Sequence, residues 1–237
     1  MRHAWILFIV FVLLFQSSAG IGLTADQDQE RNSKKVKTSD PQSGQGGRRV
    51  ALVIGNGSYA EVPLSNPVND ATGVAGVFRG LGFDVVTGTN QKKVDMKRLI
   101  REFGDRLAIG EGNVGVFYFA GHGLQANGKN FMVPIGATSP TNDAEAEDQG
   151  VNLELVLAQM ERSQKGLNIV ILDACRNNPF RGWRSASNGL AFVNAPTGTL
   201  IAYATSPGRT AADGRGSNSP YTTALLRHLG KPDVSLI

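Results

Sequence analysis

The chain has 237 residues, of which 41% are hydrophobic, so it is long enough and apolar enough for one folded domain with extensions. Its net charge of +4 is mild, and its lysines and arginines form no patch interleaved with aromatic residues. These features exclude a largely disordered chain and argue against a nucleic-acid-binding protein.

Residues 1–25 are typical of a secretory signal peptide. A positively charged start precedes a short apolar stretch from Trp5 to Phe15, and small residues follow up to Ala19, where cleavage is favoured. Residues 23–25 offer a second cleavage site. The apolar stretch is too short for an ordinary membrane-spanning helix. We therefore expect an exported protein, periplasmic or secreted. The alternative is an uncleaved N-terminal anchor, which would be its only contact with a membrane.

A flexible linker is predicted next, over residues 26–48, because this segment is polar, charged and rich in glycine without apolar periodicity. A folded domain is predicted from residue 49 to residue 237. The chain stops soon after residues 230–233, which look like the start of another element. We therefore expect this domain to be truncated at its C-terminus.

Within the domain, apolar runs alternate with amphipathic segments. Continuous apolar runs bounded by turn residues are typical of buried parallel strands, and apolar residues at three- and four-residue steps are typical of helices. The alternation predicts an α/β fold in which helices cover both faces of a parallel sheet. In chain order, we expect a strand at 50–56, a helix at 66–81, a strand at 83–87, a helix at 92–109, a strand at 114–120, a hairpin at 124–134 around Asn127-Gly128, a helix at 153–162, strands at 168–173 and 199–204, and a helix at 219–229.

The single cysteine and one of the three histidines follow two of these apolar runs. His122 comes just after the run 114–120, and Cys175 comes just after the run that ends at Asp173. The carboxyl ends of parallel strands meet at one edge of a sheet, so we expect the thiol and the imidazole to lie side by side. A lone cysteine is more often a buried apolar residue. The paired placement favours nucleophilic catalysis, in which a nearby base activates the thiol.

These motifs resemble the caspase-like cysteine peptidases, in particular bacterial members of the caspase and metacaspase clan. His122 and Cys175 are about 50 residues apart, the separation found in caspases, and an Asp two residues before the cysteine is a metacaspase feature. The resemblance extends from about residue 49 to residue 229. It implies a three-layer α/β/α sandwich with a mostly parallel central sheet, and a cysteine-type endopeptidase that acts on peptides or proteins. The other segments that carry it are 51–56, 64–71 and 203–208.

The resemblance also implies roles for individual residues. His122 would be the general base, Cys175 the nucleophile, and the backbone N–H groups of Gly123 and Cys175 the oxyanion hole. Asp173 is similar to the metacaspase carboxylate that receives a basic P1 side chain, and Asp213 is a candidate for a second pocket acid. Arg or Lys is therefore the expected P1 residue. The alternative for Asp173 is a structural carboxylate that caps a turn.

No metal or cofactor is expected, because the resemblance implies a thiol and an imidazole as the only reacting groups. The acidic segment 143–148 is a weak candidate for calcium, and a solvated loop is the favoured interpretation. Residues 55–60 have the spacing of a dinucleotide-binding loop, but the prolines that follow oppose the helix such a loop requires. Nicotinamide binding is therefore not expected.

Three further expectations concern processing, His228 and the competing function. The basic segment 180–188 contains Arg181 and Arg184, which are candidate autocleavage sites. His228 is expected on the surface of a late helix. A caspase-like module without activity, acting as a protein-interaction domain, is the competing function, because a fold does not guarantee a reaction.

Overall fold

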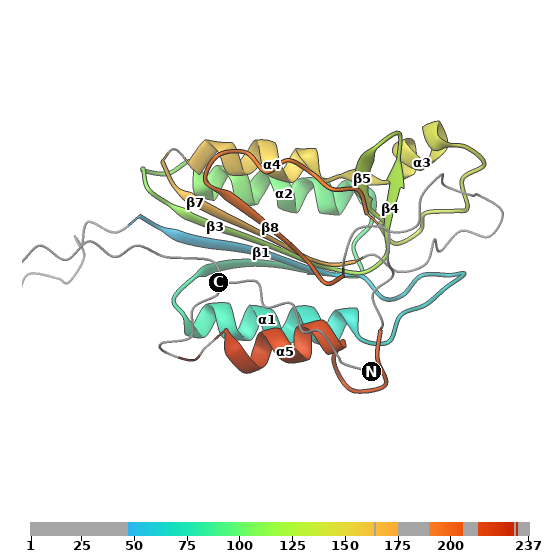
Figure 1. Cartoon of the computed structure of the whole chain (residues 1–237), viewed down its shortest axis with the longest axis horizontal. Coiled ribbons are helices and arrows are strands. Elements are labelled where there is room, and N and C mark those ends of the chain that lie inside the picture. The colour runs from blue at the N-terminus through green and yellow to red at the C-terminus, as the bar shows by residue number, and fades with distance from the viewer. Residues whose placement is uncertain (1–46, 164, 175–189, 206–212, 230, 232–237) are drawn as a thin grey trace, which may run out of the picture. The chain divides into compact units, whose positions relative to one another are not determined.

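A five-stranded parallel sheet forms the centre of the computed structural model, which describes residues 47–163, 165–174, 190–205, 213–229 and 231. These residues all belong to one compact unit, Gly46–Pro232. Helices cover both faces of the sheet (Figure 1), so the predicted α/β fold with a mostly parallel central sheet is confirmed. In sheet order, the strands are β2 (Asp84–Thr89), β1 (Arg49–Gly55), β3 (Val114–Ala120), β7 (Leu167–Asp173) and β8 (Thr199–Tyr203).

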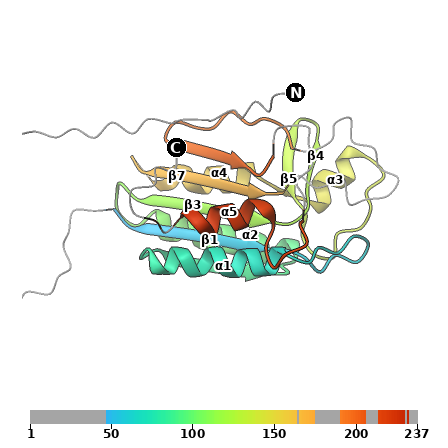
Figure 2. The same ribbon diagram turned by 60° about the horizontal axis from the view of Figure 1, so that its bottom comes forward.

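Two helices lie on each face of this sheet. The helices α1 (Pro67–Gly80) and α5 (Pro220–His228) lie side by side on one face, and α2 (Lys93–Leu107) and α4 (Glu154–Met160) lie on the other (Figures 1 and 2). Side chains of β1 alternate between two apolar clusters, one under each pair of helices. Because both faces of β1 are buried, its sequence is a continuous apolar run, and each fully buried aliphatic side chain contributes about 1.5–3 kcal/mol.

The predicted strands and helices are present, with differences at their ends. The helix α1 starts at a proline in its first turn and stops just before Gly82, whose φ of 76° cannot continue a helix. The strand β2 is displaced toward its carboxyl end and runs to Thr89, beyond the predicted end at residue 87. After Met160, a short 3-10 helix (Glu161–Ser163) completes the predicted helical segment 153–162.

The predicted hairpin is confirmed and begins directly after His122. Its strands β4 (Gly123–Ala126) and β5 (Lys129–Met132) pair antiparallel, and β6 (Val151–Asn152) adds a short third strand. The turn residues Asn127 and Gly128 both have positive φ values, 48° and 76°, as a two-residue type I′ turn requires. This small sheet lies at the end of the molecule where the central strands finish (Figure 1).

The interpretation of residues 143–148 as a solvated loop is wrong, because these residues form a helix, α3 (Asp143–Gln149). The Asn142 side chain accepts a hydrogen bond of 3.0 Å from the Glu145 backbone N–H, and acidic residues in the first turn favour the positive end of the helix dipole. Ala146 alone is buried, so the segment shows no apolar periodicity. Among the described residues, no cluster of three His, Cys, Asp or Glu side chains could hold a metal ion.

Several predictions fall on residues that the structure does not describe. These are the signal peptide, the linker, the cysteine, the end of the chain and the two candidate autocleavage sites, Arg181 and Arg184. Across the described ranges, no helix has both the length and the apolar character needed to cross a bilayer. No helix opens after Gly55 until Pro67, so residues 55–60 do not lead into the helix that a dinucleotide-binding loop requires. His228 is exposed on α5, as predicted.

Candidate active site

The ends of β3 and β7 place the two candidate catalytic positions on neighbouring strands. Ala120 is paired with Asp173 as the last residues of the two strands, and the Gly121 N–H lies 3.4 Å from the Asp173 carbonyl oxygen. His122 comes two positions after Ala120, and Cys175 comes two positions after Asp173. Cys175 lies outside the described residues, so the structure shows the histidine and the strand that leads to the cysteine.

His122 is buried, with 1% of its surface exposed, and a main-chain oxygen fixes its tautomer. The ring atom Nε2 lies 2.7 Å from the Val62 carbonyl oxygen. A carbonyl oxygen can only accept, so Nε2 carries the proton, and the lone pair of the neutral ring is on Nδ1. This arrangement leaves Nδ1 as the nitrogen able to take a proton from a reacting group.

Tyr59 holds His122 from the loop that follows β1. The two rings are 4.5 Å apart between centroids and are tilted by 52°. The His122 backbone N–H donates to the Tyr59 hydroxyl oxygen over 3.1 Å, and that hydroxyl donates to the Val133 carbonyl oxygen over 3.0 Å. The Val133 N–H returns a bond of 2.9 Å to the His122 carbonyl oxygen. This closed set of contacts ties the histidine both to the loop and to the hairpin.

The glycines on either side of His122 lie in close contact with their neighbours, most tightly at Gly121. A Cβ atom on Gly121 would lie 2.7 Å from the Tyr59 hydroxyl oxygen, and one on Gly123 would lie 3.1 Å from Leu190 Cδ2 and 3.2 Å from Ala174 Cβ. The first distance is too short for any side chain. The Gly-His-Gly sequence therefore allows the backbone to pass between tightly packed neighbours.

Asp173, predicted as a substrate-binding acid, is wholly buried at the end of β7. Its Oδ2 accepts hydrogen bonds from the Ser219 hydroxyl and, over 2.9 Å, from the Thr222 hydroxyl. Ser219 is also the N-cap of α5, because its Oγ accepts a bond of 2.9 Å from the Thr222 N–H. The carboxylate that precedes the cysteine by two residues is thus fixed by the first turn of a helix from the far end of the chain.

A second buried carboxylate, Asp70, meets the same serine and was missed by the sequence analysis. Its Oδ1 accepts bonds of 2.9 Å from the Ser219 N–H and from the Asn218 side-chain amide. The sequence contains a signal for the burial of Asp70, because helical spacing places it on the same stripe of α1 as the buried residues Val74 and Phe78. A carboxylate on a buried apolar stripe is rare unless a partner or a function requires it.

Two tyrosines report the negative field of these carboxylates. Burial and then the charge of Asp173 raise the pKa of Tyr221 to about 12. Burial, followed by the charges of Asp173 and Asp70, raises the pKa of Tyr118 well above its ordinary value. The Tyr118 hydroxyl lies 2.6 Å from the Thr222 hydroxyl, so it belongs to the same network.

Asp213, the other predicted pocket acid, is partly buried before α5 and contacts the segment that leads into α1. Its Oδ2 accepts a bond of 2.8 Å from the Ser65 N–H, and its carbonyl oxygen accepts a bond from the Asn66 side-chain amide. The described contacts therefore connect Asp173 with Asp70 through Ser219, and they connect Asp213 with the start of α1.

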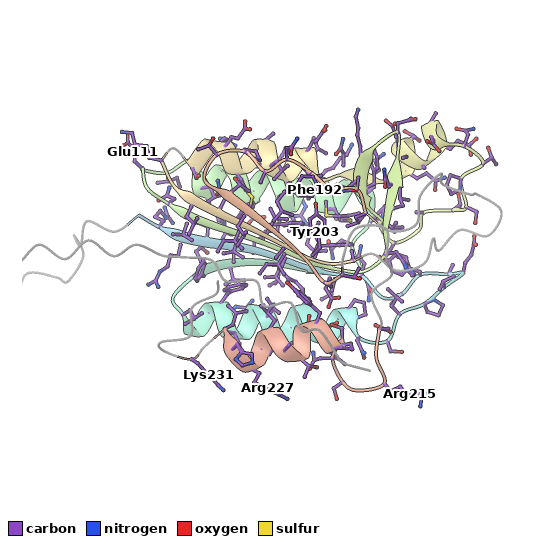
Figure 3. All side chains as sticks on the ribbon, viewed as in Figure 1. Glu111, Phe192, Tyr203, Arg215, Arg227 and Lys231 are labelled. Atoms are coloured by element: carbon purple, nitrogen blue, oxygen red, sulfur yellow. The ribbon has the colours of Figure 1, made fainter. Side chains whose placement is uncertain are left out.

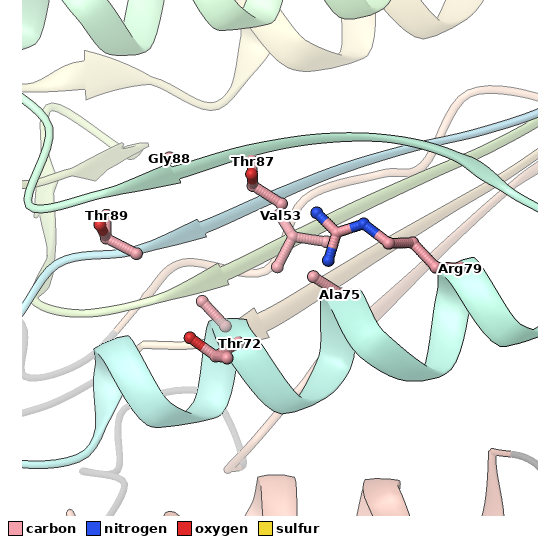
Figure 4. Close-up of a pocket in the computed structure, with 8 residues that line it drawn as sticks. Val53, Thr72, Ala75, Arg79, Thr87, Gly88 and Thr89 are labelled. Atoms are coloured by element: carbon pink, nitrogen blue, oxygen red, sulfur yellow. The ribbon is translucent and has the colours of Figure 1, made fainter.

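A separate cavity of ≈ 230 Å³ lies between α1 and the edge strand β2 (Figure 4). The Arg79 side chain extends from α1 into it (Figure 4). Neither His122 nor Asp173 lines this cavity, so it is not part of the candidate site. The lining residues are Val53, Ala71, Thr72, Ala75, Arg79, Thr87, Gly88 and Thr89.

The fold is that of a caspase-like domain, and comparison with known families agrees. Residues 48–236 match the caspase domain family, so the chain belongs to that family, whose members are in general cysteine peptidases. It is similar to the mucosa-associated lymphoid tissue lymphoma translocation protein 1 of Homo sapiens, with 34% identity over 129 residues, and to its Mus musculus homolog, with 35% identity. Each match covers 54% of this chain but only 15% of the relative's length.

Proposed function

We propose that the protein is a cysteine-type endopeptidase in which His122 and Cys175 form the catalytic dyad. The observation that carries this proposal is the 2.7 Å contact between His122 Nε2 and the Val62 carbonyl oxygen. It assigns the proton to Nε2 and the lone pair to Nδ1 in a buried imidazole. The strand next to it leads, two residues further on, to the only cysteine of the chain.

The proposed reaction divides hydrolysis into two steps. His122 Nδ1 takes the thiol proton of Cys175, and the thiolate sulfur attacks the scissile carbonyl carbon. The tetrahedral oxyanion accepts hydrogen bonds from the backbone N–H groups of Gly123 and Cys175. It collapses with loss of the amine, which takes the proton from His122. Water then attacks the thioester carbonyl carbon and gives a proton to His122 Nδ1. The tetrahedral intermediate expels the Cys175 thiolate, which takes that proton, so the acid is released and the free enzyme is restored.

We further propose that the substrate is cut after Arg or Lys. The support is the pair of buried carboxylates, Asp70 and Asp173, that bind different atoms of Ser219 close to the strand end. Two carboxylates beside one another favour a cationic guest, and a guanidinium can bind carboxylates with two parallel hydrogen bonds. Asp213, near the start of α1, is retained as a further candidate contact for that side chain.

Fluorogenic peptides that differ only in their P1 residue test both parts. The wild-type chain should cleave an Arg peptide and leave the matched Asp peptide intact. The substitutions Cys175→Ala and His122→Ala should each lower kcat/KM by at least about 1,000-fold, because the dyad acts as a unit. His228→Ala is the matched control, since that histidine is exposed on α5, and it should retain full activity.

The outcomes separate the alternatives. Equal hydrolysis by wild type and Cys175→Ala would refute the peptidase proposal and leave the protein-interaction module. Cleavage of the Asp peptide alone would refute the basic P1 preference and leave the dyad intact.

We also propose that the chain is exported. The N-terminal residue of the protein recovered outside the cytoplasm tests whether cleavage follows Ala19.

A further inference from the structure

Asn130 makes an unusual pair of contacts at the centre of the hairpin strand β5. Its side chain is buried, with 3% exposed. Its Nδ2 donates to the Ala191 carbonyl oxygen over 2.8 Å, and its Oδ1 accepts from the Ala191 N–H over 2.7 Å. One side chain thus satisfies both backbone polar groups of Ala191, as a neighbouring strand would. These two bonds are called the Asn130 clamp below.

The clamp fixes a segment that has no strand partner of its own. Residues 190–196 run toward β8 without regular secondary structure. Tyr203 of β8 adds a third contact, from its hydroxyl to the Ala191 carbonyl oxygen over 3.4 Å, and Figure 3 shows Tyr203 and Phe192 in this region. Phe192 is 72% exposed, so apolar burial at that residue does not hold the segment in place. Leu190 and Val193 pack against the main apolar cluster, and the clamp adds hydrogen bonds between the segment and the hairpin.

The residue before the clamp reaches both strand ends of the candidate site. Leu190 is 4% exposed and belongs to the same apolar cluster as Ala174. A Cβ atom on Gly123 would lie 3.1 Å from Leu190 Cδ2 and 3.2 Å from Ala174 Cβ, so Leu190 and Ala174 both pack against Gly123. Gly123 follows His122, and Ala174 precedes Cys175. Leu190 therefore lies where the two backbones that carry the dyad come together.

We infer that Asn130 is a positioning residue for the dyad, acting through Ala191 and Leu190. The inference rests on the proposed function. The clamp sets the position of Leu190, and Leu190 in turn sets the separation between Gly123 and Ala174. Loss of the clamp would let these backbones shift, and a small shift at the reacting atoms is costly in rate. Asn130 itself would not touch the substrate.

The chain contains one cysteine, so alkylation by iodoacetamide monitors a single thiol. Only the thiolate displaces iodide, and a nearby imidazolium lowers the pKa of the thiol below its ordinary value of about 8.5. The wild-type chain should therefore react faster than His122→Ala at pH 6, and the two should agree at pH 10. Asn130→Ala should lower the rate at pH 6 by about tenfold, because a thiol that no longer pairs with the imidazolium is less ionised at that pH, with no change at pH 10.

Asn113→Ala provides the matched control. Asn113 is equally buried and also bridges backbone groups, with bonds of 2.7 Å from the Arg48 N–H and to the Leu107 carbonyl oxygen. It precedes β3, at the end of the sheet opposite His122. This substitution should reduce stability in a urea titration and leave the alkylation profile unchanged. If Asn130→Ala does not fold, Leu190→Val tests the positioning role instead. It keeps the clamp but shortens the side chain between the strand ends, so it too should lower the alkylation rate at pH 6.

The results distinguish the two proposals. Identical alkylation profiles for wild type and His122→Ala would refute the dyad itself. The positioning role would be overturned, and the dyad left intact, if the wild-type profile depends on His122 but folded Asn130→Ala has the wild-type profile. If Asn130→Ala does not fold, an unchanged profile for Leu190→Val would have the same meaning. An equal effect of Asn113→Ala would also overturn it, because any loss of buried hydrogen bonds would then suffice.

Discussion

Removal of the Ser219 hydroxyl is the most informative single change in the network around Asp173. The Ser219 hydroxyl has two partners. Its oxygen caps α5 by accepting a hydrogen bond from the Thr222 N–H, and its proton is donated to the buried Asp173 carboxylate. The substitution Ser219→Ala removes both interactions. The Ser219 backbone N–H remains and continues to donate to Asp70. The change therefore tests the hydroxyl alone and leaves the rest of the residue in place.

The expected cost follows from these two losses. Loss of an N-cap serine costs about 1 kcal/mol. Removing one donor from a buried charged acceptor costs about 2 kcal/mol more, and Asp173 keeps its bond to Thr222. We expect Ser219→Ala to lower the free energy of unfolding by about 3 kcal/mol. Asn142→Ala removes an exposed cap of the same kind from α3 and should cost only about 1 kcal/mol.

Urea unfolding of the two variants measures this difference directly. The Arg-peptide assay adds a second measurement, because a displaced Asp173 should raise KM for that substrate if the carboxylate receives the P1 side chain. Equal destabilisation by Ser219→Ala and Asn142→Ala would show that Asp173 gains nothing from the hydroxyl. In that case the reasoning that links α5 to the candidate site would be refuted.

Three further substitutions test the contacts that hold His122 and the raised pKa of Tyr221. Gly121→Ala should abolish hydrolysis, because its Cβ would lie 2.7 Å from the Tyr59 hydroxyl oxygen; a folded and fully active variant in the peptide assay would contradict this packing. Tyr59→Phe keeps the ring against His122 but loses both hydroxyl contacts, and should lower kcat by about tenfold with little change in KM; unchanged kcat would argue against a positioning role. Because the pKa of Tyr221 is raised to about 12, the unfolded chain loses this proton first as the pH rises above about 10, and stability falls across that window by up to about 3 kcal/mol. Tyr221→Phe should flatten the decline in urea midpoints between pH 9 and pH 12, and equal slopes would contradict the assignment.

The central fold could be predicted because its determinants are local. The strands β1, β3 and β7 are buried on both faces, so their sequences are continuous apolar runs that few other structures require. The helix α2 has a regular stripe of buried residues along one side. By contrast, α3 has one buried residue and is stabilised mainly by its cap and its first-turn charges, so apolar periodicity could not reveal it.

The site was harder to predict because its contacts are not local. Nothing in the side chain of Val62 identifies its carbonyl oxygen as the partner of His122. Asp70 and Ser219 are far apart in the sequence, and only the packing of α5 against α1 brings them together. The position of His122 just after the end of β3 could be predicted, because the strand-end rule depends on sheet topology alone.

The register of β7 explains why a helix near the end of the chain can influence the cysteine position. Tyr118 and Ile171 are paired across β3 and β7 and face the cluster under α1 and α5. Asp173 is two residues after Ile171, so it faces the same helices and meets Thr222 there. A slip of one residue would turn Asp173 toward the opposite face and away from α5. The hydrogen bonds to Ser219 and Thr222 therefore stabilise the register of the strand from which Cys175 follows, as well as the position of one carboxylate.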